Sequence, residues 1–150
     1  MTSMKIGSNF ETLREPVLMA SDGHHDTDGL AVWEFYNRFL FIAKRTYILS
    51  AVGDQPQFHG KHAHKALNQL FICVQGEAII DLHVTDKAKP QKRFILGVNQ
   101  GLHLTSGYWR EVQLRKNTIL IVLADMPFDE SDYIRDWAIY QEWLSSACKK

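Results

Sequence analysis

The chain has 150 residues, and its 17 lysines and arginines balance its 17 aspartates and glutamates. This length suits one domain spanning residues 1–150, and the balanced charge excludes a strongly basic surface that would recruit nucleic acid or anionic lipid. Two isolated cysteines (Cys73 and Cys148), no signal-peptide pattern and no apolar run of roughly 20 residues predict a cytoplasmic protein without a disulfide framework or membrane helix.

The N-terminal segment 1–29 is predicted to be an irregular arm or an early strand followed by a loop, because it carries little periodic pattern. Turn-forming residues dominate positions 21–29. The cluster of His24, His25, Asp26 and Asp28 within them is a conceivable metal site, but a polar turn of this kind is usually just solvated.

The middle of the chain is predicted to be β-structure, because short apolar runs follow one another with no helical stretch between them. Such spacing is typical of an antiparallel sandwich or barrel. Gln75-Gly76 and the stretch Lys87–Lys92 are predicted as hairpin turns. In the run 77–85, alternation predicts four inward residues (Ala78, Ile80, Leu82, Val84) and three outward ones (Glu77, Asp81, His83). The predicted strands are Leu30–Phe35, Phe39–Val52, Asn68–Val74, Glu77–Thr85, Arg93–Val98, Leu102–Ser106, Arg110–Arg115 and Thr118–Ala124.

The C-terminal part changes character after Pro127, which ends the last predicted strand. Asp129 or Ser131 can cap a helix, and acidic residues in its first turn favour one there. We therefore predict an amphipathic helix over 131–147. Its apolar stripe, which we interpret as core packing or a contact with a partner chain, contains Tyr133, Trp137, Tyr140 and Leu144.

The sequence His62-Ala63-His64 is the most informative local pattern. On a strand, alternate side chains share a face, so the two imidazoles should lie together. Gln69 stands where a metal site of this spacing has an acid, and a neutral amide is a poor ligand for a transition metal. The face of His103 stays open, so a third imidazole is not assured. We therefore expect acid–base chemistry by the imidazole pair, with no metal and no cofactor.

The segment Gly60–Lys65 followed by Gln69 and Gly76 resembles the first motif of the cupins, with the acid replaced. Together with Lys44–Ile48 and Asp129–Arg135, most of residues 28–144 is similar to the sugar-nucleotide 3,4-ketoisomerases. The resemblance implies an all-β cupin fold, a double-stranded β-helix (jelly-roll) barrel with a C-terminal α-helix. It also implies a homodimer that exchanges N-terminal strands, which would give residues 1–35 a role.

The activity implied by the resemblance is metal-independent isomerisation of a nucleotide-linked sugar. The ketone of a 4-keto-6-deoxyhexose, carried by dTDP, would move from C4 to C3 through an enediol, in deoxyamino-sugar synthesis for a surface polysaccharide. His62 and His64 would transfer the protons. Around them, Tyr47 and Gln69 would orient the carbonyl. Arg45 and Arg110 would bind the diphosphate, and Trp109 would stack on a ring of the substrate.

Two departures from the family pattern leave alternatives open. His59-Gly60 and Asp28-Gly29 stand where the family has Arg-Gly, which removes cations suited to phosphate. The alternatives are an epimerase-like relative, a non-catalytic sugar-nucleotide-binding cupin and a metal-dependent cupin oxygenase. Product stereochemistry, proton exchange with water and metal content, respectively, would distinguish them.

Overall fold

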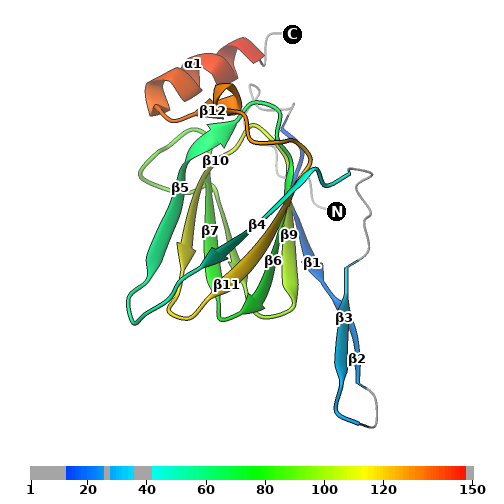
Figure 1. Cartoon of the computed structure of the whole chain (residues 1–150). Helices are drawn as coiled ribbons and strands as arrows, with labels where there is room; N and C mark the ends of the chain where they lie inside the picture. Colours follow the sequence, from blue (N-terminus) through cyan, green and yellow to red (C-terminus); the bar gives the residue numbers. More distant parts are fainter. Residues whose placement is uncertain (1–12, 26–27, 36–41, 148–150) are drawn as a thin grey trace.

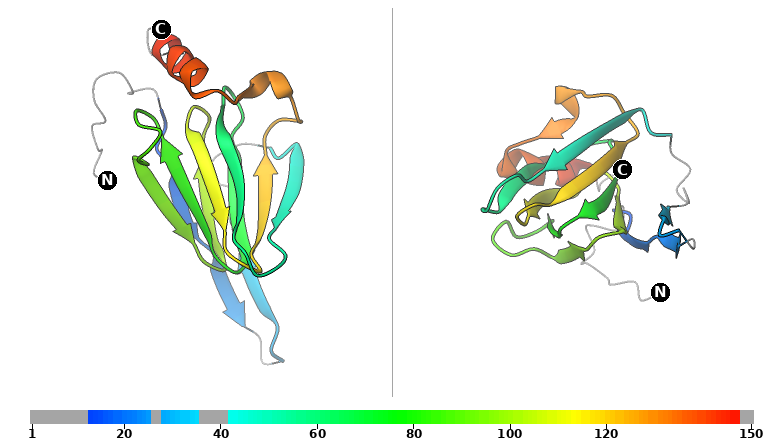
Figure 2. Two further views of the ribbon diagram at one scale, coloured as in Figure 1. Left: turned by 90° about the vertical axis from the view of Figure 1, so that its left-hand side faces the viewer. Right: turned by 60° about the horizontal axis from the view of Figure 1, so that its bottom comes forward.

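The structure is a computed structural model that describes residues 13–25, 28–35 and 42–147. Two antiparallel five-stranded sheets face each other and enclose the core (Figures 1 and 2). The first contains, in spatial order, β1 (Val17–Ala20), β9 (Gln100–Leu104), β6 (Gln69–Gln75), β11 (Ile119–Ala124) and β4 (Arg45–Ser50). The second contains β12 (Tyr133–Ile134), β5 (Gln57–His64), β10 (Trp109–Leu114), β7 (Ala78–His83) and β8 (Lys92–Leu96).

The core is built from alternate residues of these strands, as the sequence predicts. Ala78, Ile80, Leu82 and Val84 are all fully buried, because they share the inner face of the second sheet. His83 points to the outer face as predicted, yet it is only 4% exposed, since the C-terminal helix covers it. The prediction of a mostly β chain with a C-terminal helix is confirmed.

One of the two predicted hairpins is present. The stretch Lys87–Lys92 joins β7 to β8, which pair antiparallel. The prediction for Gln75-Gly76 was wrong. Gly76 does turn the chain, with φ of +76°. However, β6 pairs with β9 and β11, so the turn carries the chain across to the other sheet. A local turn signal does not reveal which strand becomes the neighbour.

The predicted loop over 21–29 was also wrong in part. Asp22–His25 forms β2, which pairs with β3 (Ala31–Glu34) in a hairpin that extends beyond the sandwich (Figure 1). Gly23 lies opposite Trp33, and a Cβ on Gly23 would come within 2.2 Å of the indole ring. A glycine that reads as a turn former therefore makes room for a cross-strand aromatic. Asp26, of the cluster His24, His25, Asp26 and Asp28, lies outside the described residues.

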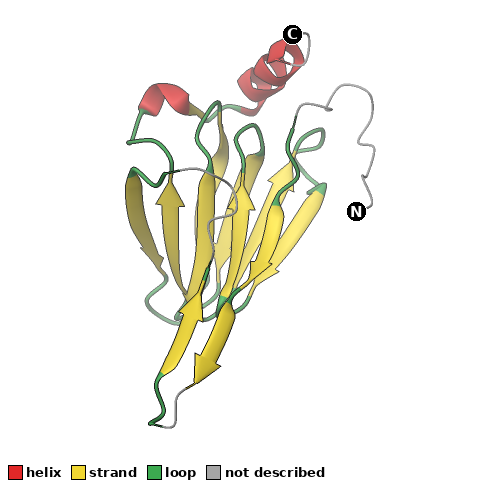
Figure 3. Ribbon diagram, turned by 90° about the vertical axis from the view of Figure 1, so that its right-hand side faces the viewer, coloured by secondary structure: helices red, strands yellow, loops and turns green. Residues whose placement is uncertain are grey.

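The C-terminal helix is shorter than predicted. α1 spans Trp137–Ala147, and a 3-10 turn, η1 (Glu130–Asp132), and the short strand β12 precede it at the same end of the sandwich (Figure 3). Asp129 caps η1, whereas Asp136 caps α1 by accepting from Ile139 N at 3.0 Å. The stripe of Tyr140 and Leu144 packs into the core as predicted. Neither helix of the described residues is long and apolar enough to cross a membrane.

Candidate active site

A β-bulge in β5 turns the two histidines into the interior. The pairing with β10 places Arg110 opposite His62 and Glu111 opposite Gly60, which leaves Lys61 unpaired. Gly60 and Lys61 both have positive φ, +106° and +61°. A Cβ at Gly60 would lie 2.8 Å from the Arg110 carbonyl oxygen, so only glycine fits this bulge. Because the bulge shifts the strand phase by one residue, His62 joins the inner face that Arg110 occupies.

The two imidazoles form a hydrogen-bonded chain with a carboxylate. His62 Nε2 lies 3.1 Å from His64 Nε2, and His64 Nδ1 lies 2.9 Å from Asp132 Oδ2. A carboxylate only accepts, so His64 carries its proton on Nδ1 and His62 donates to His64 from Nε2. The Asp132 carboxylate is held in turn by Ala66 N at 2.8 Å and Leu67 N at 3.4 Å.

Strand β12 covers the pair with an aromatic ring. Tyr133 pairs with His64 across β12 and β5, and its ring centroid lies 4.9 Å from that of His62 and 4.3 Å from that of His64. The Arg135 guanidinium stacks over the Tyr133 ring at 4.3 Å. The sequence pattern predicts both Asp132 and Tyr133 in the C-terminal helix, so their place in the active site was not expected.

A second polar chain lies beside the histidines. Arg110 Nη1 donates to Gln69 Oε1, and Gln69 Nε2 donates to the hydroxyl of Tyr47 at 2.7 Å. Arg110 also donates to the Tyr108 carbonyl oxygen from Nη2 at 3.2 Å. Tyr47 faces the interior, because it lies opposite the buried Val122 in the neighbouring strand β11, yet it stays partly exposed. Solvent therefore reaches the inner face at this edge strand.

The electrostatics keep both imidazoles neutral. Burial and the charge of Arg110 lower the pKa of His62 from 6.5 to about 3 and that of His64 to about 2. The Asp132 carboxylate on His64 Nδ1 works in the opposite direction and would stabilise a proton taken up by the pair. Burial lowers the pKa of Arg110 to about 10, so its guanidinium stays charged at neutral pH. Neutral histidines are the form that can accept a proton.

We expect the free energy of unfolding to fall as the pH drops from about 6.5 towards 3. The folded-state pKa values of His62 and His64 are depressed, so the unfolded chain takes up these protons first and is favoured as the pH falls. Each histidine contributes about 1.4 kcal/mol per pH unit in this window. The free energy of unfolding, measured by urea denaturation between pH 7 and pH 4, should fall less steeply with decreasing pH for His62→Gln than for the wild type. An identical pH dependence of the two free energies would contradict the assigned protonation states.

The other predicted site residues divide into two groups. Arg45 stays near the site, since its guanidinium stacks over the Tyr47 ring at 5.1 Å. Trp109 is away from it: the side chain points to the outer face of β10, where it packs against Trp137 and Tyr140 of α1 at 2% exposure. The prediction that Trp109 stacks on a substrate ring therefore conflicts with its burial under α1. The sequence pattern around Trp109 does not reveal this contact, because α1 comes much later in the chain.

Arg110 and His103 also differ from expectation. Arg110 is 1% exposed, and its guanidinium is occupied by Gln69 and the Tyr108 carbonyl, so it does not present a free fork to a diphosphate. His103 lies on the outer face of β9, between the buried inner residues Leu102 and Leu104, and so does not join the pair. Neighbouring strand positions alternate between faces, and sequence alone left the face of His103 open.

A divalent cation, which many cupins hold at this position, does not fit these residues. The Nε2 atoms of His62 and His64 face each other in a hydrogen bond, and the guanidinium of Arg110 reaches the oxygen of Gln69. A metal would meet a neutral amide and a fixed positive charge where it needs a carboxylate.

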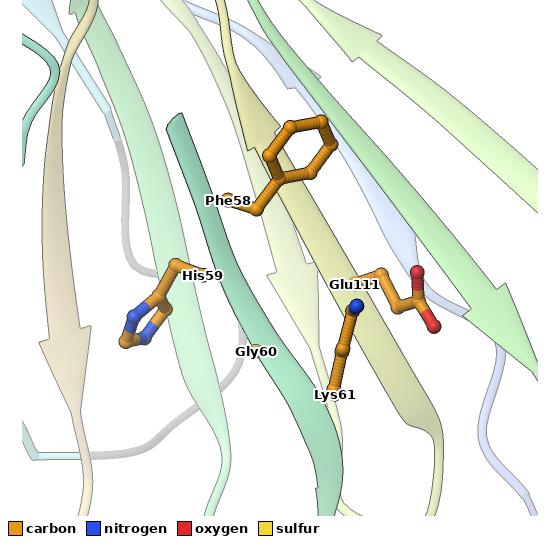
Figure 4. A pocket seen from close by; sticks show the side chains of 5 residues that line it. All are labelled: Phe58, His59, Gly60, Lys61 and Glu111. Carbon is orange, nitrogen blue, oxygen red and sulfur yellow. The ribbon is translucent and has the colours of Figure 1, made fainter. Parts of the chain in front are cut away.

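A separate pocket lies over the bulge. It has a volume of about 210 Å³ and is lined by Phe58, His59, Gly60, Lys61 and Glu111 (Figure 4). His59 points to one side of β5, whereas Phe58 and Lys61 point to the other. None of the lining residues belongs to either polar chain. The pocket therefore adjoins the histidines in sequence, but it is not the space in which they meet.

Known proteins share this fold and sequence pattern. The family described as FdtA, WxcM-like C-terminal, matches residues 16–145. A TDP-4-oxo-6-deoxy-alpha-D-glucose-3,4-oxoisomerase from Aneurinibacillus thermoaerophilus is 28% identical over 117 residues, covering 77% of this chain and 81% of the relative.

Solved structures agree. A double mutant of the QdtA 3,4-ketoisomerase from Thermoanaerobacterium thermosaccharolyticum, in complex with TDP, superposes with a TM-score of 0.74 at 27% identity, covering 88% of this chain and 95% of that one. Another mutant of that enzyme is in complex with TDP-4-keto-6-deoxyglucose. A 3,4-ketoisomerase from Helicobacter canadensis gives a TM-score of 0.73 at 28% identity, covering 87% of this chain and 97% of that one.

Proposed function

Because the chain belongs to the FdtA (WxcM-like, C-terminal) family, as its sequence pattern predicts, we propose that it is a 3,4-ketoisomerase of TDP-linked 4-keto-6-deoxyhexoses. The observation that carries the proposal is the chain Asp132–His64–His62, which holds two neutral imidazoles beside the Tyr47 hydroxyl network. A protein that only bound sugar nucleotides would gain nothing from a buried carboxylate behind a buried imidazole pair.

The first half of the reaction forms the enediol. The imidazole pair removes the proton from C3, the C3–H electrons form the C3=C4 double bond, and the C4 carbonyl π electrons move to O4, which receives a proton. The proton on the pair is stabilised where His64 meets the Asp132 carboxylate. Tyr47 donates the hydrogen bond that supports developing charge on O4, and Gln69 orients Tyr47.

The second half returns a proton to the neighbouring carbon. O3 loses its proton and forms the C3 carbonyl, while the electrons of the double bond take up a proton at C4 from the imidazole pair. C3 is thereby oxidised and C4 reduced, so the atoms and electrons balance without a cofactor. His62 and His64 can serve both halves because a histidine is restored to its neutral form after each transfer.

Arg45 is the remaining candidate for diphosphate binding. It lies at the partly exposed edge, and its Nε is buried without a hydrogen-bond partner among the described residues. A diphosphate beside it would satisfy that donor. The same negative charge would raise the depressed pKa values of His62 and His64 toward the range in which a base is effective.

The fold proposal is the cupin jelly roll. In the two sheets, β4, β11, β6 and β9 face β5, β10, β7 and β8, an order consistent with two interlocked Greek keys. The cytoplasmic location stays part of the proposal, and the free buried thiol of Cys73 is consistent with a reducing compartment.

A homodimer is also part of the proposal. The outer face of the first sheet carries an aliphatic row in which Ile121 pairs with Ile48 on one side and Ile72 on the other, and Ile48 is 64% exposed. The β2–β3 hairpin extends from the same body toward space that a second copy could fill (Figure 1). The molar mass from light scattering would test this: a monomeric mass at micromolar concentration would refute it.

The activity is tested with TDP-4-keto-6-deoxyglucose in deuterium oxide. We expect a 3-keto product with deuterium at C4, at a rate unchanged by a chelator. Inversion at a carbon without movement of the ketone would indicate the epimerase instead. A thermal shift with the nucleotide sugar but no product and no deuterium would indicate a non-catalytic binding protein.

A further inference from the structure

Arg110, Gln69 and Tyr47 form a chain whose polarity is fixed at one end. We propose that Arg110 and Gln69 are positioning residues that make the Tyr47 hydroxyl an obligate hydrogen-bond donor toward the substrate carbonyl. This inference rests on the proposed function, and it assigns a reason to the amide that stands where many cupins have an acid.

The direction of each hydrogen bond follows from what its atoms can do. A guanidinium has donors only, so the oxygen of the Gln69 amide must face Arg110. The NH₂ group of Gln69 must then face Tyr47, whose oxygen accepts at 2.7 Å. With that lone pair used, the phenolic proton points elsewhere, and among the described residues it has no acceptor. Tyr47 is thus left to donate into the space beside the histidines.

Arg110, the residue at the fixed end of this hydrogen-bonded chain, lowers the stability of the fold because its charge is buried, which argues for a role in function. Arg110 is 1% exposed, and within the described part of the chain it forms no ion pair. Its guanidinium is held by the Tyr108 carbonyl oxygen at 3.2 Å and 3.4 Å, and by Gln69. Burying an unpaired charge opposes folding, so such a group is retained where chemistry needs it.

A glutamate at position 69 would reverse the polarity. A carboxylate accepts from Arg110 and also accepts from the Tyr47 hydroxyl, so the phenolic proton would turn toward residue 69. Size, shape and the contact with Arg110 would be kept, and the guanidinium would gain a charged partner. The change from amide to acid therefore alters the direction of one hydrogen bond with little change in packing.

The test compares Gln69→Glu, Tyr47→Phe and the double variant with TDP-4-keto-6-deoxyglucose. Losing one donor to a developing oxyanion costs about 10²- to 10³-fold in kcat, so we expect that loss in each single variant with little change in KM. If Gln69 acts through Tyr47, the double variant is no slower than either single variant. Gln113→Glu, on the outer face of β10, is the matched control for the added charge and should keep wild-type kcat.

The remaining outcomes separate this inference from its alternatives. Wild-type activity in Gln69→Glu, or a double variant whose loss is the product of the two single losses, would overturn it. A new acid beside His62 and His64 would supply three potential metal ligands, so each assay is repeated with a chelator. Rescue of Gln69→Glu by the chelator would also overturn the inference. If Gln69→Glu fails to fold, Gln69→Leu replaces it, and its loss should likewise vanish in the Tyr47→Phe background. No turnover or proton exchange by the wild type would refute the proposed function itself.

Discussion

The substitution His64→Asn is expected to remove nearly all isomerase activity while leaving the fold intact. Asparagine cannot take up a proton near neutral pH, and general acid–base catalysis by one group is worth about 10²- to 10⁴-fold. The side-chain amide of asparagine can still donate to Asp132, which preserves the contact between β5 and η1. His64 is 1% exposed, so a polar residue of smaller size there should change stability modestly, not unfold the protein.

The measurement is deuterium incorporation from solvent into TDP-4-keto-6-deoxyglucose, followed by mass spectrometry. His83→Asn is the matched control, because it replaces another buried histidine, one that lies under α1 and outside the site. We expect the control to exchange at the wild-type rate. If His64→Asn exchanged as fast as the control, His64 would not be the proton-transferring residue.

Most strands of the two large sheets and the paired histidines could be predicted from the sequence because both depend on local periodicity. Alternation in β7 identified its inner face, and the two-residue spacing of His62 and His64 put both rings on one face. The bulge at Gly60 was not predicted, although it decides that this face is the inner one. A bulge depends on the pairing with the partner strand, here β10, so a single glycine in the sequence does not predict it.

Asp132 and Tyr133 show why the rest of the site could not be predicted. The acidic run 129–132 looks like the first turn of a helix, and local propensity favours that interpretation. In the structure, Asp132 instead accepts from Ala66 N and His64, which lie 66 and 68 residues earlier in the chain. Because Tyr133 and Ile134 form β12 and pair with β5, they are not helical, and α1 begins only at Trp137. Long-range contacts of this kind override local propensity.

Trp109 and Arg110 illustrate the same limit on a single strand. Family resemblance assigned both to the ligand, but adjacent residues on a strand point to opposite faces. Arg110 therefore enters the interior behind Gln69, whereas Trp109 is sealed under α1. The site thus rests on two chains, each fixed by a buried charge: Asp132 sets the protons of the histidines, and Arg110 sets the proton of Tyr47.

The substitution Asp132→Asn is expected to lower kcat by about 10²- to 10⁴-fold, a range typical of losing a carboxylate that orients a catalytic histidine. The amide oxygen of asparagine can keep the bond from Ala66 N, which leaves its NH₂ group facing His64 Nδ1. His64 must then accept at Nδ1 and carry its proton on Nε2, where it meets the Nε2 proton of His62. Both tautomers are disturbed, and the charge that stabilises a transferred proton is gone.

The pH profile distinguishes this role from a structural one. Without the carboxylate the pKa of the imidazole pair falls further. The apparent pKa that the histidine pair contributes to the pH dependence of kcat should therefore be lower in Asp132→Asn than in the wild type. Asp136→Asn is the control, since asparagine caps α1 as well as aspartate does, and its kcat and melting temperature should match the wild type. A variant Asp132→Asn with wild-type kcat would mean that the histidines transfer protons without the carboxylate. The assignment of the buried charge behind His64 to catalysis would then fail, whereas the assignment of the imidazole pair itself would depend on His64→Asn alone.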